Sequence, residues 1–121
     1  MANQIVWCDI PVLDLDRAAK FYSAVLGAQV KKEQFPGGMT IGLLPHTDGE
    51  VNGCLFTSDD EKPSDKGLLI YLNASGRLDA AIDAVVPNGG KVIKPKHPIG
   101  PYGHRAIILD SEGNRVALHS D

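Results

Sequence analysis

Short apolar runs and one amphipathic stretch alternate along the first half of the chain. The runs at residues 4–12, 29–36, 39–45 and 52–58 are bounded by Gly, Pro or Asp, which is typical of strands. Between the first two runs, apolar residues from Ala18 to Leu26 recur at helical spacing. Asp14 or Asp16 is placed as the N-cap of this helix, and Gly27 as its stop. The pattern predicts a strand, a helix and three further strands.

The second half repeats this order. Residues 67–73 predict a strand, and residues 75–90 a helix that Ser75 opens and residues 87–90 close. Three more strands are predicted at residues 91–100, 104–110 and 114–120. The chain is therefore expected to have an α+β fold built from two βαβββ modules, with "GCLF" in the first equivalent to "VALH" in the second. We place module one at residues 1–58, a charged linker at 59–66, and module two at 67–121.

Composition narrows the class of protein. With 121 residues, 43% of them hydrophobic, the chain suits one globular domain, 1–121. The net charge of −3 and the scattered Lys and Arg residues argue against nucleic-acid binding. No apolar run approaches the roughly 20 residues that cross a bilayer, so we expect no membrane contact and a cytoplasmic protein. Cys8 and Cys54 are too few for a disulfide framework and are expected as thiols.

The two ends of the chain resemble a known superfamily. "IPVLDLDRAAKFYSAVLG" and "LDSEGNRVALHS" resemble the opening strand and helix and the closing hairpin of the vicinal oxygen chelate proteins. These include glyoxalase I, the bleomycin and fosfomycin resistance proteins and the extradiol dioxygenases. "GGKVIKPKHPIGPYGH" resembles the short, single-domain glyoxalase-like members in particular. The resemblance covers the whole chain and implies two modules that form an open barrel or cup around a small molecule, in a homodimer whose modules pair within or across chains.

In enzymes of this superfamily, His and Glu side chains hold a divalent metal that stabilises an oxyanion of the substrate. The ligands come from the first and last strands of each module. Carrying these positions over by motif places them at Trp7, Cys54, Gly67 and Ala117. Only a thiolate among these could bind metal, and one ligand does not make a site. The resemblance thus implies a member without the family's metal ligands, and we expect no metal and no cofactor.

Other polar residues are candidates for ligand contact. Tyr102, His104 and Arg105 lie in a glycine-flanked segment that overhangs the mouth of the cup in the resembling proteins, and His119 follows Ala117 by two positions. A Tyr and His pair near a pocket suits hydrogen bonding to a polar ligand or acid–base catalysis. His46 is interpreted as a loop residue, and His97 as an exposed residue.

Asp9 should share the cup face of its strand with Trp7, because it lies two residues further along. A charge there needs a partner or water. Asp9 either pairs with a basic residue such as Arg105 or Arg115, or contacts the ligand. Glu33 is a further candidate, although its strand is interpreted as mostly solvated.

Three functions remain open. The first is a metal-free binding module for a planar or aromatic molecule, in which Trp7 offers a stacking surface. The second is a lyase, isomerase or dioxygenase-type enzyme whose site is rebuilt from Asp9, Glu33, His104 and His119. The third is an accessory domain with a filled cup. The first is our working prediction, and its ligand-binding residues are Trp7, Asp9, Cys54, Tyr102, His104, Arg105 and His119.

Overall fold

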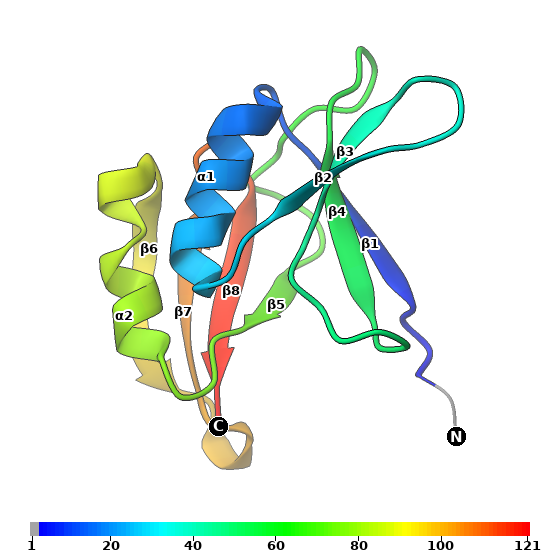
Figure 1. Ribbon diagram of the computed structural model, residues 1–121. Coiled ribbons are helices and arrows are strands. Elements are labelled where there is room, and N and C mark those ends of the chain that lie inside the picture. Colours follow the sequence, from blue (N-terminus) through cyan, green and yellow to red (C-terminus); the bar gives the residue numbers. More distant parts are fainter. Residues whose placement is uncertain (1–2) are drawn as a thin grey trace.

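The computed structural model describes residues 3–121, so residues 1 and 2 of the predicted first module lie outside the described chain. The first module contains β1 (Trp7–Pro11), α1 (Leu15–Leu26), β2 (Lys31–Gln34), β3 (Thr40–Leu43) and β4 (Asn52–Phe56). The second contains β5 (Ile70–Asn73), α2 (Leu78–Asp83), β6 (Lys91–Pro98), β7 (His104–Leu109) and β8 (Arg115–Ser120), with 3₁₀ turns η1 (Val86–Asn88) and η2 (Gly100–Tyr102) (Figure 1). The predicted α+β fold of two βαβββ modules is confirmed.

Each module forms its own four-stranded sheet. The strand orders are β1-β4-β3-β2 in what we call sheet A and β5-β8-β7-β6 in sheet B. In both, the first strand runs parallel to the last, while the other neighbours are antiparallel. Equivalent hydrogen bonds end both parallel pairs, from the Val12 amide to the Phe56 carbonyl (2.8 Å) and from the Ala74 amide to the His119 carbonyl (2.7 Å). The modules therefore correspond residue by residue along these strands.

The two helices begin differently. Asp14 caps α1 by accepting a hydrogen bond from the Arg17 amide (3.0 Å), and Gly27 ends the helix in the left-handed conformation at φ 72°, as expected. Ser75 does not open α2, which starts at Leu78 without a side-chain cap. The Ser75 amide instead donates a hydrogen bond to the Asn73 side chain (2.9 Å) within a turn, and the helix begins only after this turn.

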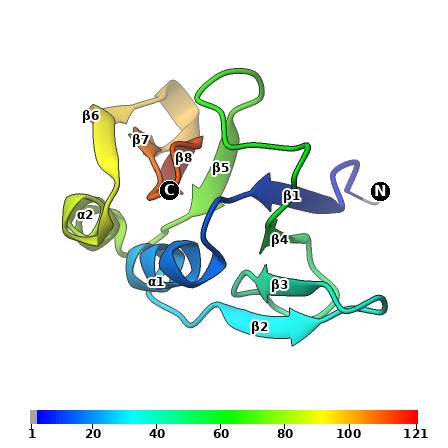
Figure 2. The ribbon, with the colours of Figure 1, turned by 90° about the horizontal axis from the view of Figure 1, so that it is seen from above.

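One apolar core joins both modules. It contains Phe21, Tyr22 and Val25 of α1, together with residues of α2 and one face of each sheet. Figure 2 shows the sheets meeting at an angle, with both helices inside that angle. Because side chains alternate along a strand, the second face of each sheet points away from the core. We call these the outer face of sheet A and the outer face of sheet B; the sheets do not close into a barrel.

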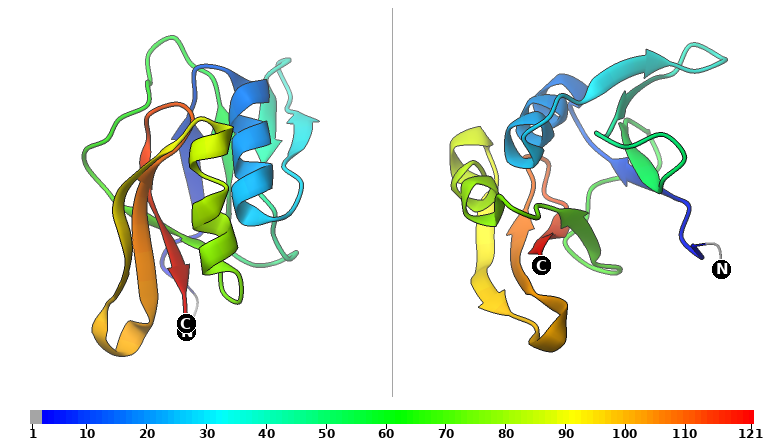
Figure 3. Two further views of the ribbon diagram at one scale, coloured as in Figure 1. Left: turned by 90° about the vertical axis from the view of Figure 1, so that its left-hand side faces the viewer. Right: turned by 60° about the horizontal axis from the view of Figure 1, so that its bottom comes forward.

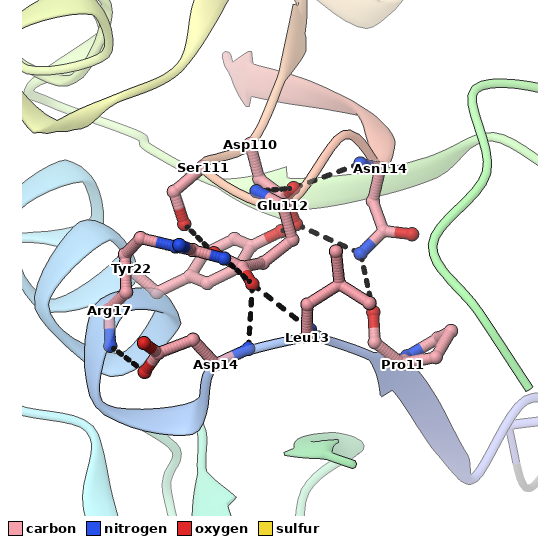
Figure 4. A network of polar contacts seen from close by, with 9 residues as sticks. All are labelled: Pro11, Leu13, Asp14, Arg17, Tyr22, Asp110, Ser111, Glu112 and Asn114. Atoms are coloured by element: carbon pink, nitrogen blue, oxygen red, sulfur yellow. Dashed lines mark hydrogen bonds and ion pairs between the residues drawn. The ribbon is translucent and has the colours of Figure 1, made fainter. Parts of the chain in front are cut away.

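The turn between β7 and β8, residues 110–114, binds the first module through hydrogen bonds (Figure 4). We call this turn with its bonds the clasp. The Glu112 carboxylate is buried and accepts hydrogen bonds from the Leu13 amide (3.0 Å), the Asp14 amide (2.9 Å) and Arg17 Nε (2.6 Å). Burial alone would raise the pKa of Glu112, but the hydrogen bonds from Arg17, Asp14, Ser111 and Leu13 lower it to about 2. The start of α1 is therefore bound to sheet B through one carboxylate.

Two further residues of this turn complete the clasp. The Tyr22 hydroxyl donates to Asp110 (2.6 Å), whose other oxygen accepts from the amides of Glu112 and Asn114. The Asn114 side chain donates to the Pro11 carbonyl (2.8 Å), just after Asp9 in β1. The clasp thus fixes β1 and α1 against the second module.

Among residues 3–121, no helix is both long enough and apolar enough to span a bilayer.

Candidate functional site

The outer face of sheet A is built around Trp7, Asp9 and Cys54. Trp7 and Asp9 alternate with core residues along β1, and Cys54 lies opposite Asp9 on β4. Cys54 also packs with Ile41 and Phe56 in a small apolar cluster apart from the main core. These three residues are buried, so what this face exposes to solvent includes the Trp7 ring and the Asp9 carboxylate.

Trp7 and Cys54 both donate hydrogen bonds to the same Asp9 oxygen, from indole Nε1 at 2.8 Å and from Sγ at 3.4 Å. The expected pairing of Asp9 with Arg105 or Arg115 is absent within the described chain, since both arginines belong to sheet B. Burial, together with the neighbouring Asp9 carboxylate, raises the pKa of the Cys54 thiol to about 12. Cys54 is consequently a protonated donor at neutral pH.

The equivalence of the modules locates the four positions that correspond to metal ligands in the resembling proteins. Cys54 lies opposite Asp9 and Ala117 opposite Tyr71, in agreement with the expected match of "GCLF" to "VALH". Trp7 lies five residues before Val12, and the residue five before Ala74 is Leu69. The counterpart of Trp7 is therefore Leu69 and not Gly67, which lies in the loop before β5.

The outer face of sheet B holds a second polar cluster. Arg105 Nε donates to His97 Nε2 (2.9 Å), and a terminal nitrogen of Arg105 donates to the Tyr71 hydroxyl. The His119 ring packs edge-on against Tyr71, with ring centroids 5.9 Å apart, and its Nε2 donates to the Tyr102 carbonyl (2.6 Å). Four strands, β5 to β8, each supply one side chain to this cluster: Tyr71, His97, Arg105 and His119.

The predicted site residues of module two are only partly brought together. Arg105 and His119 are neighbours, but the Tyr102 side chain is exposed and only its carbonyl takes part. His104 alternates with Arg105 and so lies on the face that carries Ala106 and Ile108 into the core. Among these residues, His104 and His119 are thus on opposite faces of sheet B.

Two members of the cluster were not singled out from the sequence. His97 was expected to be exposed, yet it is half-buried on β6, the edge strand of its sheet, where Pro95 and Pro98 are tolerated. Tyr71 had a readable signal, since it alternates with Ile70 and Leu72 on the core side of β5 and is equivalent to Asp9. A hollow of about 570 Å³ borders the cluster and is lined by Gly100, Pro101, Tyr102, Gly103, His119 and Asp121.

Within one chain, the outer face of sheet A and the outer face of sheet B point in different directions. Both helices lie in the angle between the sheets, so the faces with Trp7 and with Arg105 are turned to different sides of the molecule (Figures 2 and 3). Residues 3–121 contain no group of three or more His, Cys, Asp or Glu side chains close enough to share a metal ion. One chain therefore presents two separate candidate surfaces.

The comparisons with known proteins agree with this architecture. The chain is 33% identical over 122 residues to a "Glyoxylase-like domain-containing protein" of Didymella fabae, covering 96% of this chain and 92% of that protein. It is 30% identical over 115 residues to the "Putative glyoxylase CFP32" of Mycobacterium bovis, covering 93% of this chain but only 43% of that protein. The chain thus spans less than half the length of this relative.

A solved glyoxalase/bleomycin resistance protein from Albidiferax ferrireducens shares the fold, with a TM-score of 0.80 at 18% identity and with 98% of this chain and 99% of that chain covered. The model of the Glyoxalase/Bleomycin resistance protein/Dioxygenase superfamily matches residues 4–118. The match takes in both modules and both outer faces. The chain therefore belongs to the glyoxalase/bleomycin resistance protein/dioxygenase superfamily.

Proposed function

We propose that the protein binds a small aromatic molecule through Trp7 and does so without a metal ion. The observation that carries this proposal is the state of Trp7, which remains 42% exposed and has its indole N–H held by Asp9. The family resemblance assigns a metal ligand to this position. A tryptophan ring fixed at its edge and open on its surface is suited to stacking against a flat ligand. Because the ring is already held in place, less side-chain entropy is lost on binding than for a freely rotating side chain.

The residues at the four family positions do not fit a divalent metal. Leu69 and Ala117 have no donor atom, and Trp7 offers only an N–H that is already donated. The Cys54 thiol, with its pKa raised to about 12, is not a thiolate at neutral pH. Asp9 would be the single remaining ligand, which is too few for a stable site. Under this proposal the chain has no glyoxalase activity that depends on a metal in this place.

A covered pocket would need a second copy of the chain. The outer face of sheet A in one copy would form one wall, and the outer face of sheet B in the other copy would form the opposite wall. Charge supports this pairing, since Asp9 and Glu33 outnumber Lys31 on the first face and Arg105 and Arg115 lie on the second. Two walls are what most small-molecule sites require to exclude water.

We therefore expect a homodimer with two-fold symmetry. Light scattering at micromolar concentration should give twice the mass of one chain. Charge reversal at Asp9, as Asp9→Lys, should weaken the dimer because it places positive charge opposite the arginines of the partner. A monomer mass for the unaltered protein across this concentration range would contradict the paired arrangement.

Binding can be tested through Trp7, which is the only tryptophan of the chain and so the only source of its indole emission. We expect some members of a set of planar aromatic compounds to quench or shift this emission. Trp7→Ala should abolish their binding, measured by calorimetry, while lowering the free energy of unfolding by only about 1 kcal/mol, because the ring is not buried.

Phe35→Ala is a matched control, since Phe35 has the same 42% exposure and lies in the loop after β2. It should leave binding unchanged. The proposal fails if no compound perturbs Trp7 emission and Trp7→Ala loses the roughly 3–5 kcal/mol typical of a truncated core aromatic. That pair of results would make Trp7 a structural residue.

A further inference from the structure

We propose that the ligand carries an acidic group, a carboxylate or a phosphate, which Arg105 binds on the outer face of sheet B. This inference rests on the proposed function and adds the chemical class of the ligand to it. It starts from the partners of Arg105, because the charge of this residue is not compensated within the chain.

Arg105 has only neutral partners among residues 3–121. Its guanidinium donates to an imidazole nitrogen of His97 and to the hydroxyl of Tyr71. None of the ion pairs formed by the described residues includes Arg105. The guanidinium has further N–H groups on its terminal nitrogens, and these are available to an external acceptor. A half-buried cation without a counter-charge favours binding of an anion.

The guanidinium is also held in one orientation. His97 Nδ1 donates to the Pro95 carbonyl (2.8 Å), and this bond leaves the lone pair of His97 Nε2 to accept from Arg105 Nε. Tyr71 holds the other end of the group, so residues of β5, β6 and β7 together fix its plane. A fixed guanidinium plane binds carboxylate or phosphate oxygens through two parallel hydrogen bonds at little cost in entropy.

A hollow that could take a ring lies beyond His119, the neighbour of Arg105 on β8. The His119 ring stands beside Tyr71 and lines the hollow of about 570 Å³, whose lining includes Asp121 and not Arg105. Aromatic edges and an open hollow next to a bound anionic group suit a ligand that combines an acid with a flat apolar body. The inference therefore specifies an aromatic acid or an aryl phosphate.

Three probes that share one ring system separate the contribution of the acidic group to binding from that of the ring. We would titrate the full-length protein with 1-naphthoate, 1-naphthyl phosphate and the uncharged 1-naphthamide. The side-chain N–H resonances of Trp7 (indole Nε1) and Arg105 (guanidinium Nε), observed by ¹⁵N NMR, report on the two faces independently. We expect at least one of the two anions to bind about tenfold or more tightly than naphthamide and to shift the Arg105 resonance. The better of the two anions identifies the acidic group.

Variants of Arg105 should remove this preference. Arg105→Gln is expected to bring the affinity for the preferred anion down to that for naphthamide. Arg105→Lys keeps the charge but loses the planar fork, and it should retain only part of the preference. Lys96→Gln is the matched control, because Lys96 lies on the neighbouring strand β6 but pairs with Asp79 of α2 (3.2 Å), so it should bind like the unaltered protein.

Each failure has a distinct meaning. If all three probes shift Trp7 equally and none shifts Arg105, aromatic binding stands and the anion site is wrong. If an anion shifts Arg105 while no probe affects Trp7, the anion site stands and the proposed function fails. If Arg105→Gln dissociates the dimer without changing the preference for anions, Arg105 serves the contact between copies and the inference is overturned.

Discussion

Replacing Glu112 with alanine is expected to lower the free energy of unfolding by about 2–4 kcal/mol at pH 7, because it removes a buried carboxylate that accepts several hydrogen bonds, among them one from the half-exposed Arg17 guanidinium. The Glu112 side chain is fully buried, at 0% exposure, and it accepts hydrogen bonds from Leu13, Asp14 and Arg17. Its removal leaves two main-chain N–H groups and a guanidinium without their acceptor. Urea denaturation followed by circular dichroism measures this loss.

An exposed carboxylate gives the control. Asp79 pairs with Lys96 at the surface, and Asp79→Ala should cost less than about 1 kcal/mol. The acid range gives a second check with Glu112→Gln. The folded pKa of about 2 lies below the ordinary value of 4.5, so the carboxylate stabilises the fold fully above that ordinary value. The stability difference between the unaltered protein and Glu112→Gln should therefore shrink as pH falls from 4.5 toward 2. A difference that does not change with pH would show that the charge of Glu112 is not what the clasp uses.

Gly53→Ala is expected to lower the free energy of unfolding by about 2–3 kcal/mol. Gly53 lies directly opposite Cys8 where β4 meets β1, and a Cβ at this position would come within 2.5 Å of the Cys8 carbonyl oxygen. A main-chain atom cannot move aside alone, so β1 would have to separate from β4. Asp9 would then move away from Cys54, and the emission maximum of Trp7 should shift along with the lower denaturation midpoint.

Gly42→Ala provides the comparison within the same sheet. A Cβ on Gly42 would meet side-chain atoms of Val30, Leu15 and Leu55 at 3.1, 3.3 and 3.5 Å, and these can adjust. We expect it to cost about 1 kcal/mol or less, with unchanged Trp7 emission. Equal losses for the two variants would mean that contact with Cys8 does not set the spacing of β1 and β4.

The secondary structure was largely predictable because its signals are local. The eight strands follow from short apolar runs between turn residues, and α1 from helical spacing bounded by Asp14 and Gly27. The start of α2 was wrong, since Ser75 resembles a cap but belongs to a turn held by Asn73. The same residue types serve as helix caps and as turn residues, so only the backbone conformation distinguishes the two roles.

The candidate site was predictable to the extent that strand alternation decides it. Alternation correctly placed Trp7 and Asp9 on one face of β1, and it would also have separated His104 from Arg105. The partner of Asp9 could not be derived, because Cys54 lies 45 residues away along the chain. The bond from Arg105 to Tyr71 could not be derived either, because the two residues lie 34 positions apart on strands that are not neighbours in the sheet. Ligand binding by any of these residues stays a prediction.

The sequence by itself determined the two βαβββ modules and the shared face of Trp7 and Asp9 on β1, since periodicity and turn chemistry act over a few neighbouring residues. Only the tertiary structure decided how the modules are joined. The angle between the sheets depends on packing both helices into one core and on the bonds of Glu112 to Leu13 and Asp14, 99 and 98 residues away. Such contacts form when distant segments meet and leave no periodic signal in the chain. For this reason the outward direction of the two candidate surfaces is a property of the folded molecule alone.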